Sequence, residues 1–203
     1  LPPSWAADFW KGRVAISLLL LADGQALPPE AVPRATRLAL PPGDDNLLTV
    51  LEDICEGPPA GRFEVSAADF LNILDVAAQT RIAVAGKGDL TVESIPMQTI
   101  LRADLDQNSG DLIIFPSTEL PFARTGELPA YLVNGRRGRV FANGHVWPMK
   151  NVLPVPYHSI YQKDEVVPRE RVINFLRRDL PGLQAITPLE MELLGVPQGV
   201  MLR

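Results

Sequence analysis

Residues 138–154 have the sequence GRVFANGHVWPMKNVLP, which contains the strongest short hairpin signal in the chain. Both residues of the Asn143-Gly144 pair tolerate the positive φ that a type I′ turn requires. In that register, alternate side chains share one face, namely Val140, Ala142, His145 and Trp147. The opposite face carries Arg139, Phe141 and Val146. Because both faces carry apolar bulk, we expect the hairpin to pack on one side and to be partly covered on the other.

Short β-rich segments precede this hairpin along the chain. In residues 80–116, apolar side chains recur with a period of two or β-branched residues form short runs. Glycine, proline and the polar stretch DQNSG interrupt these segments. The segments are RIAVA (81–85), LTVESI (90–95), QTILRADL (98–105) and DLIIFP (111–116). They predict a meander of antiparallel strands, followed by a loop over 117–129 and a strand, AYLVN, at 130–134.

The N-terminal part contains a long apolar segment, RVAISLLLLADGQ, at 13–25. Its β-branched start and its lack of polar alternation favour a strand covered on both faces that ends at the Asp23-Gly24 turn signal. A buried helix is the alternative. A short strand, TRLAL, is predicted at 36–40 before two prolines end it.

Two helices are predicted before the β-rich region. The first covers 46–56, where leucine and isoleucine recur at three- and four-residue spacing after a cap at Asp44 or Asp45. The second begins with Ser66 and Asp69 in capping-box spacing, with the carboxylate returning to the backbone of the cap. Its expected buried face, within 66–79, is Phe70, Leu71, Leu74, Ala77 and Ala78.

Two further helices are predicted near the C-terminus. Pro168 can occupy the first turn of a helix over 169–180, which Pro181-Gly182 ends. The inward side chains of that helix are Val172, Phe175 and Leu176. Thr187 is the expected cap of a short helix over 188–194, with Glu190 as its capping-box partner.

These elements predict the α+β fold class, with mostly antiparallel short strands and three or four short helices. The 20 prolines among 203 residues, close to twice the usual share of about 5%, fall between apolar runs and favour short elements with rigid connections. A hydrophobic content of 46% and a charged content of 21% allow a self-sufficient core. We expect a single domain over residues 1–203.

Charge divides that domain into two subregions. Residues 1–133 carry 9 basic and 18 acidic side chains, whereas residues 134–180 carry 9 basic and 4 acidic ones. The subregions are therefore an acidic α+β part, 1–133, and a part over 134–203 with the basic hairpin and the C-terminal helices. The net charge of −5 disfavours a generally basic nucleic-acid binder but allows a local basic patch. An ordinary solvated face is the alternative.

Cysteine content and hydropathy restrict the environment of the protein. Cys55 is the only cysteine, so no intrachain disulfide can form, which fits a cytoplasmic protein. The longest apolar run, VAISLLLLA at 14–22, is far shorter than the roughly 20 residues that span a bilayer, so we expect no membrane partner. The chain begins at Leu1 rather than at methionine, and we expect it to be a segment of a longer polypeptide.

Motifs for metal, phosphate or covalent chemistry are incomplete. One cysteine with His145 and His158 cannot fill a structural zinc site without carboxylates or a second chain. The stretch DLDQNSGD at 104–111 lacks the glycine and the bidentate glutamate of a calcium loop, so a polar turn is favoured. AGKGD and NGRRGR lack the spacing of phosphate-binding loops. Cys55 lies on an amphipathic helix, where a packed thiol is favoured over a nucleophile. We therefore predict no catalytic, metal-binding or cofactor-binding residue.

Basic and aromatic side chains gather within residues 134–180. Basic groups can follow a phosphate backbone, and aromatic rings can stack on unpaired bases. The candidates for nucleic-acid or partner binding are Arg136, Arg137, Arg139, Trp147, Lys150, Arg177 and Arg178. A core or interface role for Trp147 is the alternative.

Five segments follow one another over residues 9–183: FWKGRVAISLLLL, DDNLLTVLEDI, GDLIIFP, GRVFANGHVWPMKNVLPVPYHSIY and VVPRERVINFLRRDLPGL. In this order they resemble the N-terminal region of bacterial Swi/Snf-type helicase-like ATPases. In that region a strand that contains a tryptophan leads to a leucine-proline segment. A helix that begins near a proline then ends at a Leu-Pro-x-Leu sequence. The phosphate-binding loop and the magnesium-holding acidic motif of the family's motor do not occur here, so no catalytic residue is carried across.

The resemblance implies a non-catalytic accessory domain that engages DNA, or that docks or regulates a covalently linked ATPase motor in a longer chain. The chain by itself is then no enzyme. A protein-interaction or assembly module unrelated to nucleic acid is the alternative. A hydrolase that uses Cys55 or an aspartate pair is a third hypothesis, and it requires a pocket that encloses those groups.

Overall fold

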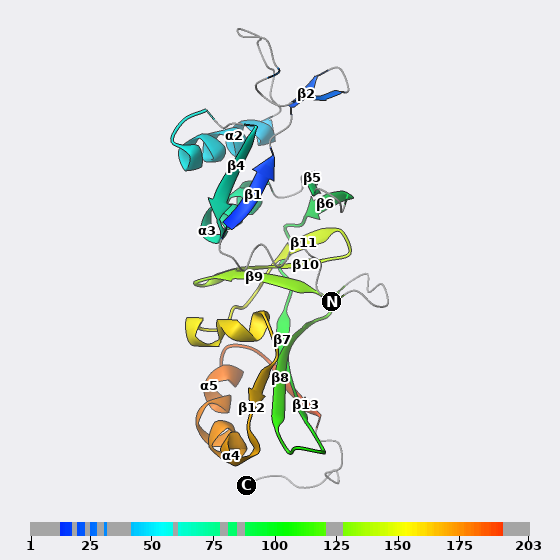
Figure 1. Cartoon of the computed structure of the whole chain (residues 1–203), viewed down its shortest axis with the longest axis vertical. Helices are drawn as coiled ribbons and strands as arrows, with labels where there is room; N and C mark the ends of the chain where they lie inside the picture. The colour runs from blue at the N-terminus through cyan, green and yellow to red at the C-terminus, as the bar shows by residue number, and fades with distance from the viewer. Residues whose placement is uncertain are drawn as a thin grey trace. The chain divides into compact units, whose positions relative to one another are not determined.

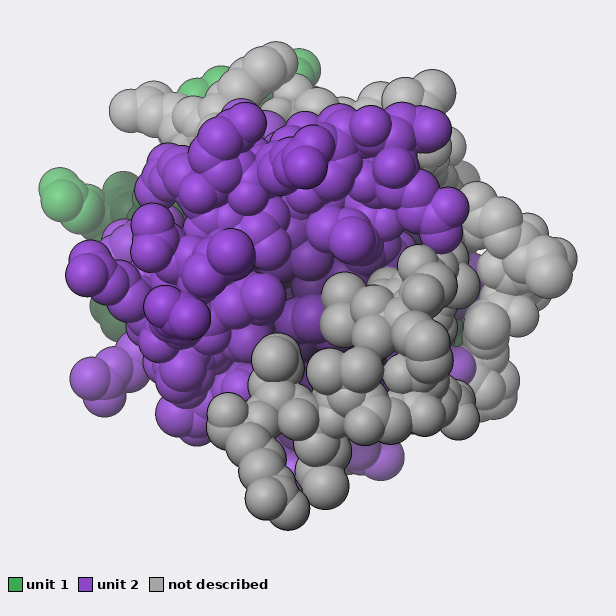
Figure 2. All heavy atoms as spheres, turned by 90° about the horizontal axis from the view of Figure 1, so that it is seen from below, with its two compact units in different colours: residues 1–94, 144–146 green, residues 95–143, 147–203 purple. Residues whose placement is uncertain are grey.

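The computed structural model describes residues 13–17, 20–22, 25–27, 31, 42–58, 61–77, 81–84, 88–120 and 128–192. Helices and strands follow one another along these residues and give an α+β fold, as the sequence predicts (Figure 1). The chain divides into two compact units, which Figure 2 colours separately. Unit 1 comprises residues 1–94 and 144–146, and unit 2 comprises residues 95–143 and 147–203.

Unit 1 contains two helices and several short pairs of strands. Its helices are α2 (Pro42–Cys55) and α3 (Ala67–Val76). Its strands are β1 (Arg13–Ser17), β2 (Leu20–Ala22), β3 (Gln25–Leu27), β4 (Arg62–Ser66), β5 (Arg81–Val84) and β6 (Gly88–Val92). β1 pairs with β4, β2 with β3, and β5 with β6, all antiparallel. The segment predicted as one strand over 13–25 therefore contains two short strands, β1 and β2, and the first residue of β3. The predicted turn at Asp23-Gly24 and the strand at 36–40 lie outside the described residues.

Helix α2 begins earlier than the sequence predicts. Its first residue is Pro42, so Asp44 and Asp45 lie inside the first turn instead of capping it. Proline suits this position because the first turn of a helix leaves its amides without intrahelical partners, so the missing N–H removes no bond. The predicted apolar stripe is confirmed in part, since Leu51 is buried and Ile54 is half-buried.

Helix α3 has the predicted cap at its N-terminus. The backbone amide of Asp69 donates to Oγ of Ser66 at 3.1 Å, which satisfies one first-turn amide. The Ser66 hydroxyl donates to the Asp69 carboxylate at 2.6 Å, so this carboxylate bonds the side chain of the cap rather than its backbone. The predicted buried face is confirmed at Phe70, Leu71, Leu74 and Ala77, while Ala78 lies outside the described residues.

Unit 2 is built on a four-stranded sheet with the order β12-β8-β7-β13. The strands of unit 2, inside and outside this sheet, are β7 (Thr99–Leu105), β8 (Leu112–Thr118), β9 (Ala130–Asn134), β10 (Arg137–Ala142), β12 (Glu165–Val167) and β13 (Leu189–Glu192), with the last two residues of β11 (His145–Pro148). Its helices are the 3-10 helix η2 (Val155–Tyr161), α4 (Arg169–Arg178) and α5 (Leu180–Gln184). α4 and η2 lie over one face of the sheet (Figure 1).

The polar stretch at 104–111 forms the turn between β7 and β8, as predicted. Oδ1 of Asp106 accepts from the backbone amide of Asn108 at 2.8 Å, and Gly110 has a φ of 77°. The amide of Asn108 lowers the pKa of the Asp106 carboxyl from its ordinary value of 3.8. These contacts are local turn contacts, so the aspartate spacing serves the hairpin.

The Asn143-Gly144 turn is confirmed by its backbone. β10 ends at Ala142 and β11 begins at His145, and the two residues between them have φ values of 51° and 75°. The expected partly covered face is wrong, because β10 is buried continuously from Gly138 to Ala142. Both sets of alternating side chains of β10 therefore belong to the core.

The division between the units differs from the charge boundary at residue 133. Val133 and Asn134 lie in β9, which pairs antiparallel with β10 through Val133↔Gly138 and Asn134↔Arg137. A domain boundary at that point would separate two hydrogen-bonded strands. The change in charge therefore marks no structural boundary, and unit 2 begins at Ile95 instead.

The helix predicted over 188–194 is wrong, because residues 189–192 form β13, parallel to β7. The hydroxyl of Thr187 donates to the carbonyl of Thr99 at 2.7 Å instead of capping a helix. The Asn151 side-chain nitrogen donates to the same carbonyl at 3.0 Å and to Oγ1 of Thr187. Gln98 donates to Oδ1 of Asn151 at 2.7 Å. We call Gln98, Thr99, Asn151 and Thr187 the Asn151 cluster.

Pro181-Gly182 does not end the helical region that follows Pro168. α4 ends at Arg178, and α5 begins at Leu180 with Pro181 in its first turn. Because first-turn amides have no intrahelical acceptor, proline is tolerated there. Leu183 of α5 is 1% exposed and anchors this short helix in the core. No helix among the described residues is long and apolar enough to cross a bilayer.

Two buried tyrosines connect β8, β9 and η2. The Tyr131 hydroxyl shares a hydrogen bond with Oγ1 of Thr118 at 3.2 Å, and the Tyr161 hydroxyl accepts from the amide of Leu153 at 3.0 Å. Their ring centroids are 5.5 Å apart. Burial raises the pKa of both Tyr131 and Tyr161 to about 12, against the smaller lowering effect of their hydrogen bonds.

Replacing Asn151 with alanine should destabilise the chain by about 2–3 kcal/mol, because the buried Thr99 and Thr187 then lose hydrogen-bond partners. Urea unfolding measures this change. Asn174→Ala, at an exposed asparagine on α4, is the matched control and should change stability by less than about 0.5 kcal/mol. Equal effects of the two substitutions would contradict the structural role of the cluster.

Stability should fall at alkaline pH because of Tyr131 and Tyr161. Their pKa of about 12 in the folded chain lies above the ordinary value of 10.0, so the unfolded chain loses these protons first as pH rises. Their contribution is complete below pH 10 and is lost between pH 10 and about 12. The double variant Tyr131→Phe/Tyr161→Phe should show a smaller fall in its urea midpoint across this window. An unchanged pH dependence would disprove the assignment.

Candidate functional site

The residues predicted to bind nucleic acid or a partner differ in exposure. Arg139 is 5% exposed and Trp147 is 4% exposed, so both side chains belong to the core. Neither is available at the surface to contact a phosphate or to stack on a base. The exposed members of the predicted set are Arg136, Arg137, Lys150, Arg177 and Arg178.

Three of these exposed cations lie on neighbouring backbone segments. Arg136 is in the turn between β9 and β10, and Arg137 is the first residue of β10. Lys150 follows Met149, whose amide donates to the carbonyl of Gly138 at 2.9 Å. A Cβ atom on Gly138 would lie 2.5 Å from Sδ of Met149, so the absence of a side chain permits this close approach. We call Arg136, Arg137 and Lys150 the turn cations.

Arg177 and Arg178 lie in a different part of unit 2. They occupy the last turn of α4, where positive charge complements the negative end of the helix dipole. The seven predicted residues come from different elements, and Arg139 and Trp147 are buried, so the set does not form one exposed site.

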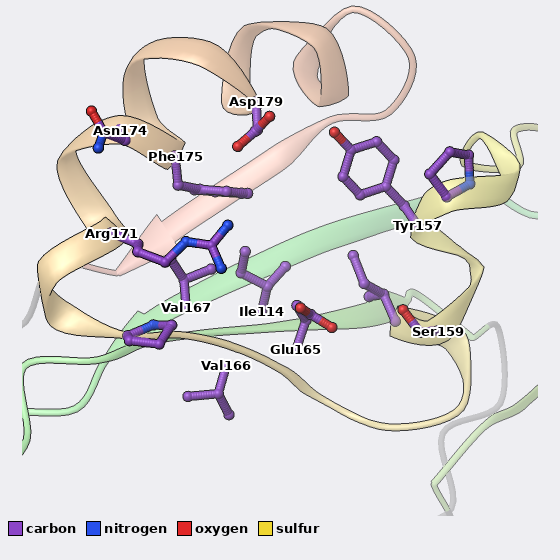
Figure 3. Close-up of a pocket in the computed structure, with 13 residues that line it drawn as sticks. Ile114, Tyr157, Ser159, Glu165, Val166, Val167, Arg171, Asn174, Phe175 and Asp179 are labelled. Atoms are coloured by element: carbon purple, nitrogen blue, oxygen red, sulfur yellow. The ribbon is translucent and has the colours of Figure 1, made fainter.

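A groove with a volume of about 310 Å³ lies between α4 and η2 in unit 2. We call it the α4–η2 groove. Its floor is apolar and buried, and it consists of Ile114, Ile160, Val167 and Phe175. These side chains come from β8, η2, β12 and α4, so four separate elements form the floor (Figure 3).

Polar side chains line the same groove. Tyr157 and Ser159 come from η2, and Glu165 comes from β12. Arg171 and Asn174 come from α4, and Asp179 directly follows that helix. Figure 3 shows Tyr157 and Asp179 on the upper side of the groove and Arg171 and Glu165 nearer its floor. The groove thus combines an apolar base with groups of both charges.

Most of these polar groups have no partner among the described residues. Across the part of the chain that the structure describes, no hydrogen bond or ion pair involves the side chains of Tyr157, Glu165, Arg171, Asn174 or Asp179. By contrast, Arg102 pairs with Glu190 at 3.3 Å on the sheet surface. The polar groups of the groove are therefore available to an external ligand.

The residues considered for catalysis have other surroundings. Nδ1 of His145 lies 2.7 Å from Oε1 of Glu93, and Nε2 of His158 lies 2.9 Å from the carbonyl of Leu153. Cys55 is half-buried at the end of α2. In the described ranges, no group of three or more histidine, cysteine, aspartate or glutamate side chains could hold a metal ion. Each imidazole thus has a partner within the protein.

The fold and the groove define an α+β protein with a candidate binding site for a small amphipathic ligand or peptide. Comparison of the chain with protein-family models, with curated proteins and with solved structures finds no match. The candidate site is therefore characterised by its own geometry and charges.

Sequence reasoning did not identify the groove as a site. It placed Phe175 on the inward face of α4, and Phe175 is buried as predicted. The available signal was that Arg171 lies three residues before Asn174 and four before Phe175, spacings that place both side chains next to Arg171 on this helix. The opposite wall could not be found in this way, because η2 and β12 are short and were not predicted.

Proposed function

We propose that this chain is a non-catalytic interaction module and that the α4–η2 groove binds a peptide segment of a protein partner. The observation that carries the proposal is a buried apolar floor surrounded by polar side chains without partners in the described chain. Binding sites generally combine these two features, and the volume of about 310 Å³ is at the small end of their usual range. The size fits a few side chains of a peptide.

The charges of the groove favour a peptide over nucleic acid. Glu165 and Asp179 line the groove and would repel the phosphates of a nucleic acid. Trp147, the aromatic member of the set of candidate binding residues, is buried elsewhere in the core. A polypeptide supplies apolar, acidic and basic side chains together, which is the combination that the groove offers to complement.

The resemblance to the N-terminal region of bacterial Swi/Snf-type helicase-like ATPases stays a prediction. The resemblance implies that the candidate partner is the ATPase motor of a longer polypeptide. Under this proposal, a segment of that motor docks in the groove and the module regulates it. We also propose a cytoplasmic location, which the single cysteine favours.

Peptides selected from a random heptapeptide phage library on the full chain should include sequences that depend on the groove. Asn174→Trp places a large ring at an exposed groove position and should weaken the binding of these peptides by at least about tenfold, because the ring occupies the ligand's volume. Fluorescence anisotropy with the labelled peptides measures the change.

Glu170→Trp is the matched control for this experiment. Glu170 is also exposed on α4 but does not line the groove, so the control should bind the selected peptides as the parent chain does. Circular dichroism and thermal unfolding check that both variants fold. The proposal fails if every selected peptide binds Asn174→Trp and the parent chain equally well.

The turn cations support a second candidate function, which is contact with a nucleic-acid backbone. Arg136, Arg137 and Lys150 are all exposed on neighbouring segments. Three cations can neutralise up to three phosphates and release the counterions of these phosphates. This surface does not include residues of the groove, and under this second candidate function it would bind the DNA backbone.

For a single-stranded oligonucleotide, three such contacts predict a slope of about −2 in a plot of log K against log salt concentration. Arg136→Ala/Arg137→Ala should make the slope less steep by about 1.4, since two phosphate contacts are lost. Arg177→Ala/Arg178→Ala is the control with the same loss of charge on α4, and it should leave the slope unchanged. A flat salt response of the parent chain would exclude this candidate.

A further inference from the structure

We infer that Asn134 is a site of spontaneous deamidation, at which the side-chain amide becomes a carboxylate, and that the new negative charge lies beside the turn cations. The reacting group is the Asn134-Gly135 dipeptide itself, and water is the co-reactant. This inference does not depend on the α4–η2 groove. Its consequence for binding rests on the second candidate function, which is contact of the turn cations with a nucleic-acid backbone.

Two asparagines of this chain have the neighbour that deamidation requires. An asparagine side chain can react with the backbone nitrogen of the next residue, and glycine hinders this approach least because it has no side chain. Of the seven asparagines, only Asn134 and Asn143 precede glycine. The other five precede leucine, isoleucine, serine, valine or phenylalanine. Residue chemistry therefore gives two candidate sites, and the structure distinguishes them.

The reaction at Asn134 has two steps. The Gly135 nitrogen loses its proton to hydroxide and attacks the side-chain carbonyl carbon of Asn134. A bond between this nitrogen and Cγ forms, the bond between Cγ and Nδ2 breaks, and ammonia leaves with a proton from water. Water then adds to one carbonyl carbon of the cyclic imide and opens the ring, which gives aspartate or its β-linked isomer. One amide and one water thus become one carboxylate and one ammonium ion, with no oxidation or reduction.

The surroundings of Asn134 permit this reaction. It is the exposed last residue of β9, and Gly135 follows in the turn to β10. Gly135 has a φ of 60°, whereas the φ of Arg136 is not positive, as in a type II′ turn. A Cβ atom placed on Gly135 would meet no atom within 4 Å outside the adjacent residues. Across the described residues, no hydrogen bond involves the Asn134 side chain or the Gly135 amide.

Ring closure at Asn134 disturbs little of the fold. It requires rotation about the bond between Cα and the backbone carbonyl carbon of Asn134. This rotation affects the strand pair Asn134↔Arg137, which is the last pair between β9 and β10 (Figure 1). Terminal pairs open at low free energy because few contacts hold them. The reaction therefore needs no unfolding of the core.

Asn143 has the same following residue but different surroundings. Its Oδ1 atom is buried, and its φ is 51° in the turn between β10 and β11. The carbonyl of Gly144 accepts from the amide of Thr91 at 2.8 Å, which holds Gly144 on β6. Ring closure here would move a buried oxygen and strain this hydrogen bond. We therefore expect Asn143 to react more slowly than Asn134, although the dipeptide sequence does not distinguish them.

Arg136 and Arg137 favour the reaction at Asn134. Both are exposed and follow Gly135 directly in the sequence. The first step places negative charge on the Gly135 nitrogen and on the side-chain oxygen, and nearby guanidinium groups stabilise negative charge. Asn134 is also the strand partner of Arg137, and directly opposite residues lie on the same face of a strand pair. The product carboxylate therefore reduces the positive charge of the turn cations.

The direct test is incubation of the folded full chain in mildly alkaline buffer, with tryptic peptide mapping by mass spectrometry. Trypsin separates the two sites because Arg136, Arg137 and Arg139 lie between them. Asn134 should convert at least about tenfold faster than Asn143, a barrier difference of about 1.4 kcal/mol. In urea, where the turns are lost, the two rates should become similar. Equal rates in the folded chain, or faster conversion of Asn143, would overturn the inference.

Two variants test the cause of the conversion. Asn134→Gln lengthens the side chain by one methylene group, so a less favourable six-membered ring has to close, and conversion at residue 134 should fall to background. Arg136→Ala/Arg137→Ala should slow conversion of Asn134 by about two- to threefold, because two exposed cations are lost. Arg177→Ala/Arg178→Ala removes the same charge from α4 and should leave the rate unchanged. Equal slowing by both double variants would contradict the role of the turn cations.

Asn134→Asp reproduces the charge of one product and tests its effect on binding. This variant should make the salt slope for a single-stranded oligonucleotide less steep by about 0.7, since one phosphate contact is offset. Asn108→Asp adds the same charge at the exposed turn between β7 and β8 and should leave the slope unchanged. Equal slopes for Asn134→Asp and the parent chain would disprove the charge effect. A flat response of the parent chain excludes the second candidate function alone, because peptide mapping decides the modification independently.

Discussion

The carbonyl of Thr99 is the point at which distant parts of unit 2 are held together. It accepts hydrogen bonds from Gln98, from Asn151 and from the Thr187 hydroxyl. Its own residue is 1% exposed, so these bonds form where water cannot replace them. They fix the segment after β11 and the segment before β13 against the first residue of β7, and the order of the sheet depends on this arrangement.

The groove follows from that arrangement. Beyond Asn151 the chain enters η2 through Leu153, whose amide and carbonyl are bonded by Tyr161 and His158. β12 then pairs with β8 as an edge strand, and Pro168 turns the chain into α4. Hydrogen bonds of the Tyr161 and His158 side chains thus position η2, while the sheet positions β12 and α4. The groove is the space that these elements leave above Ile114.

The polar residues that hold the fold and those that line the groove have opposite properties. The Asn151 cluster is satisfied within the protein, whereas Arg171, Glu165 and Asp179 have no side-chain partner among the described residues. Arg139 and Trp147, which look suited to nucleic acid in the sequence, belong to the core. Exposure and the lack of internal partners, rather than residue type, therefore distinguish candidate binding residues here.

The sequence by itself determined the elements whose hydrogen bonds are local: the Ser66–Asp69 cap of α3, the Asp106 turn and the Asn143-Gly144 turn. It also determined the α+β class, because apolar periodicity is a property of neighbouring residues. Only the tertiary structure decided that residues 189–192 are a strand, since Thr187 bonds Thr99, a residue 88 positions away, instead of capping a helix. The groove was likewise decided by the tertiary structure, because its charges and its floor come from elements that no local spacing connects.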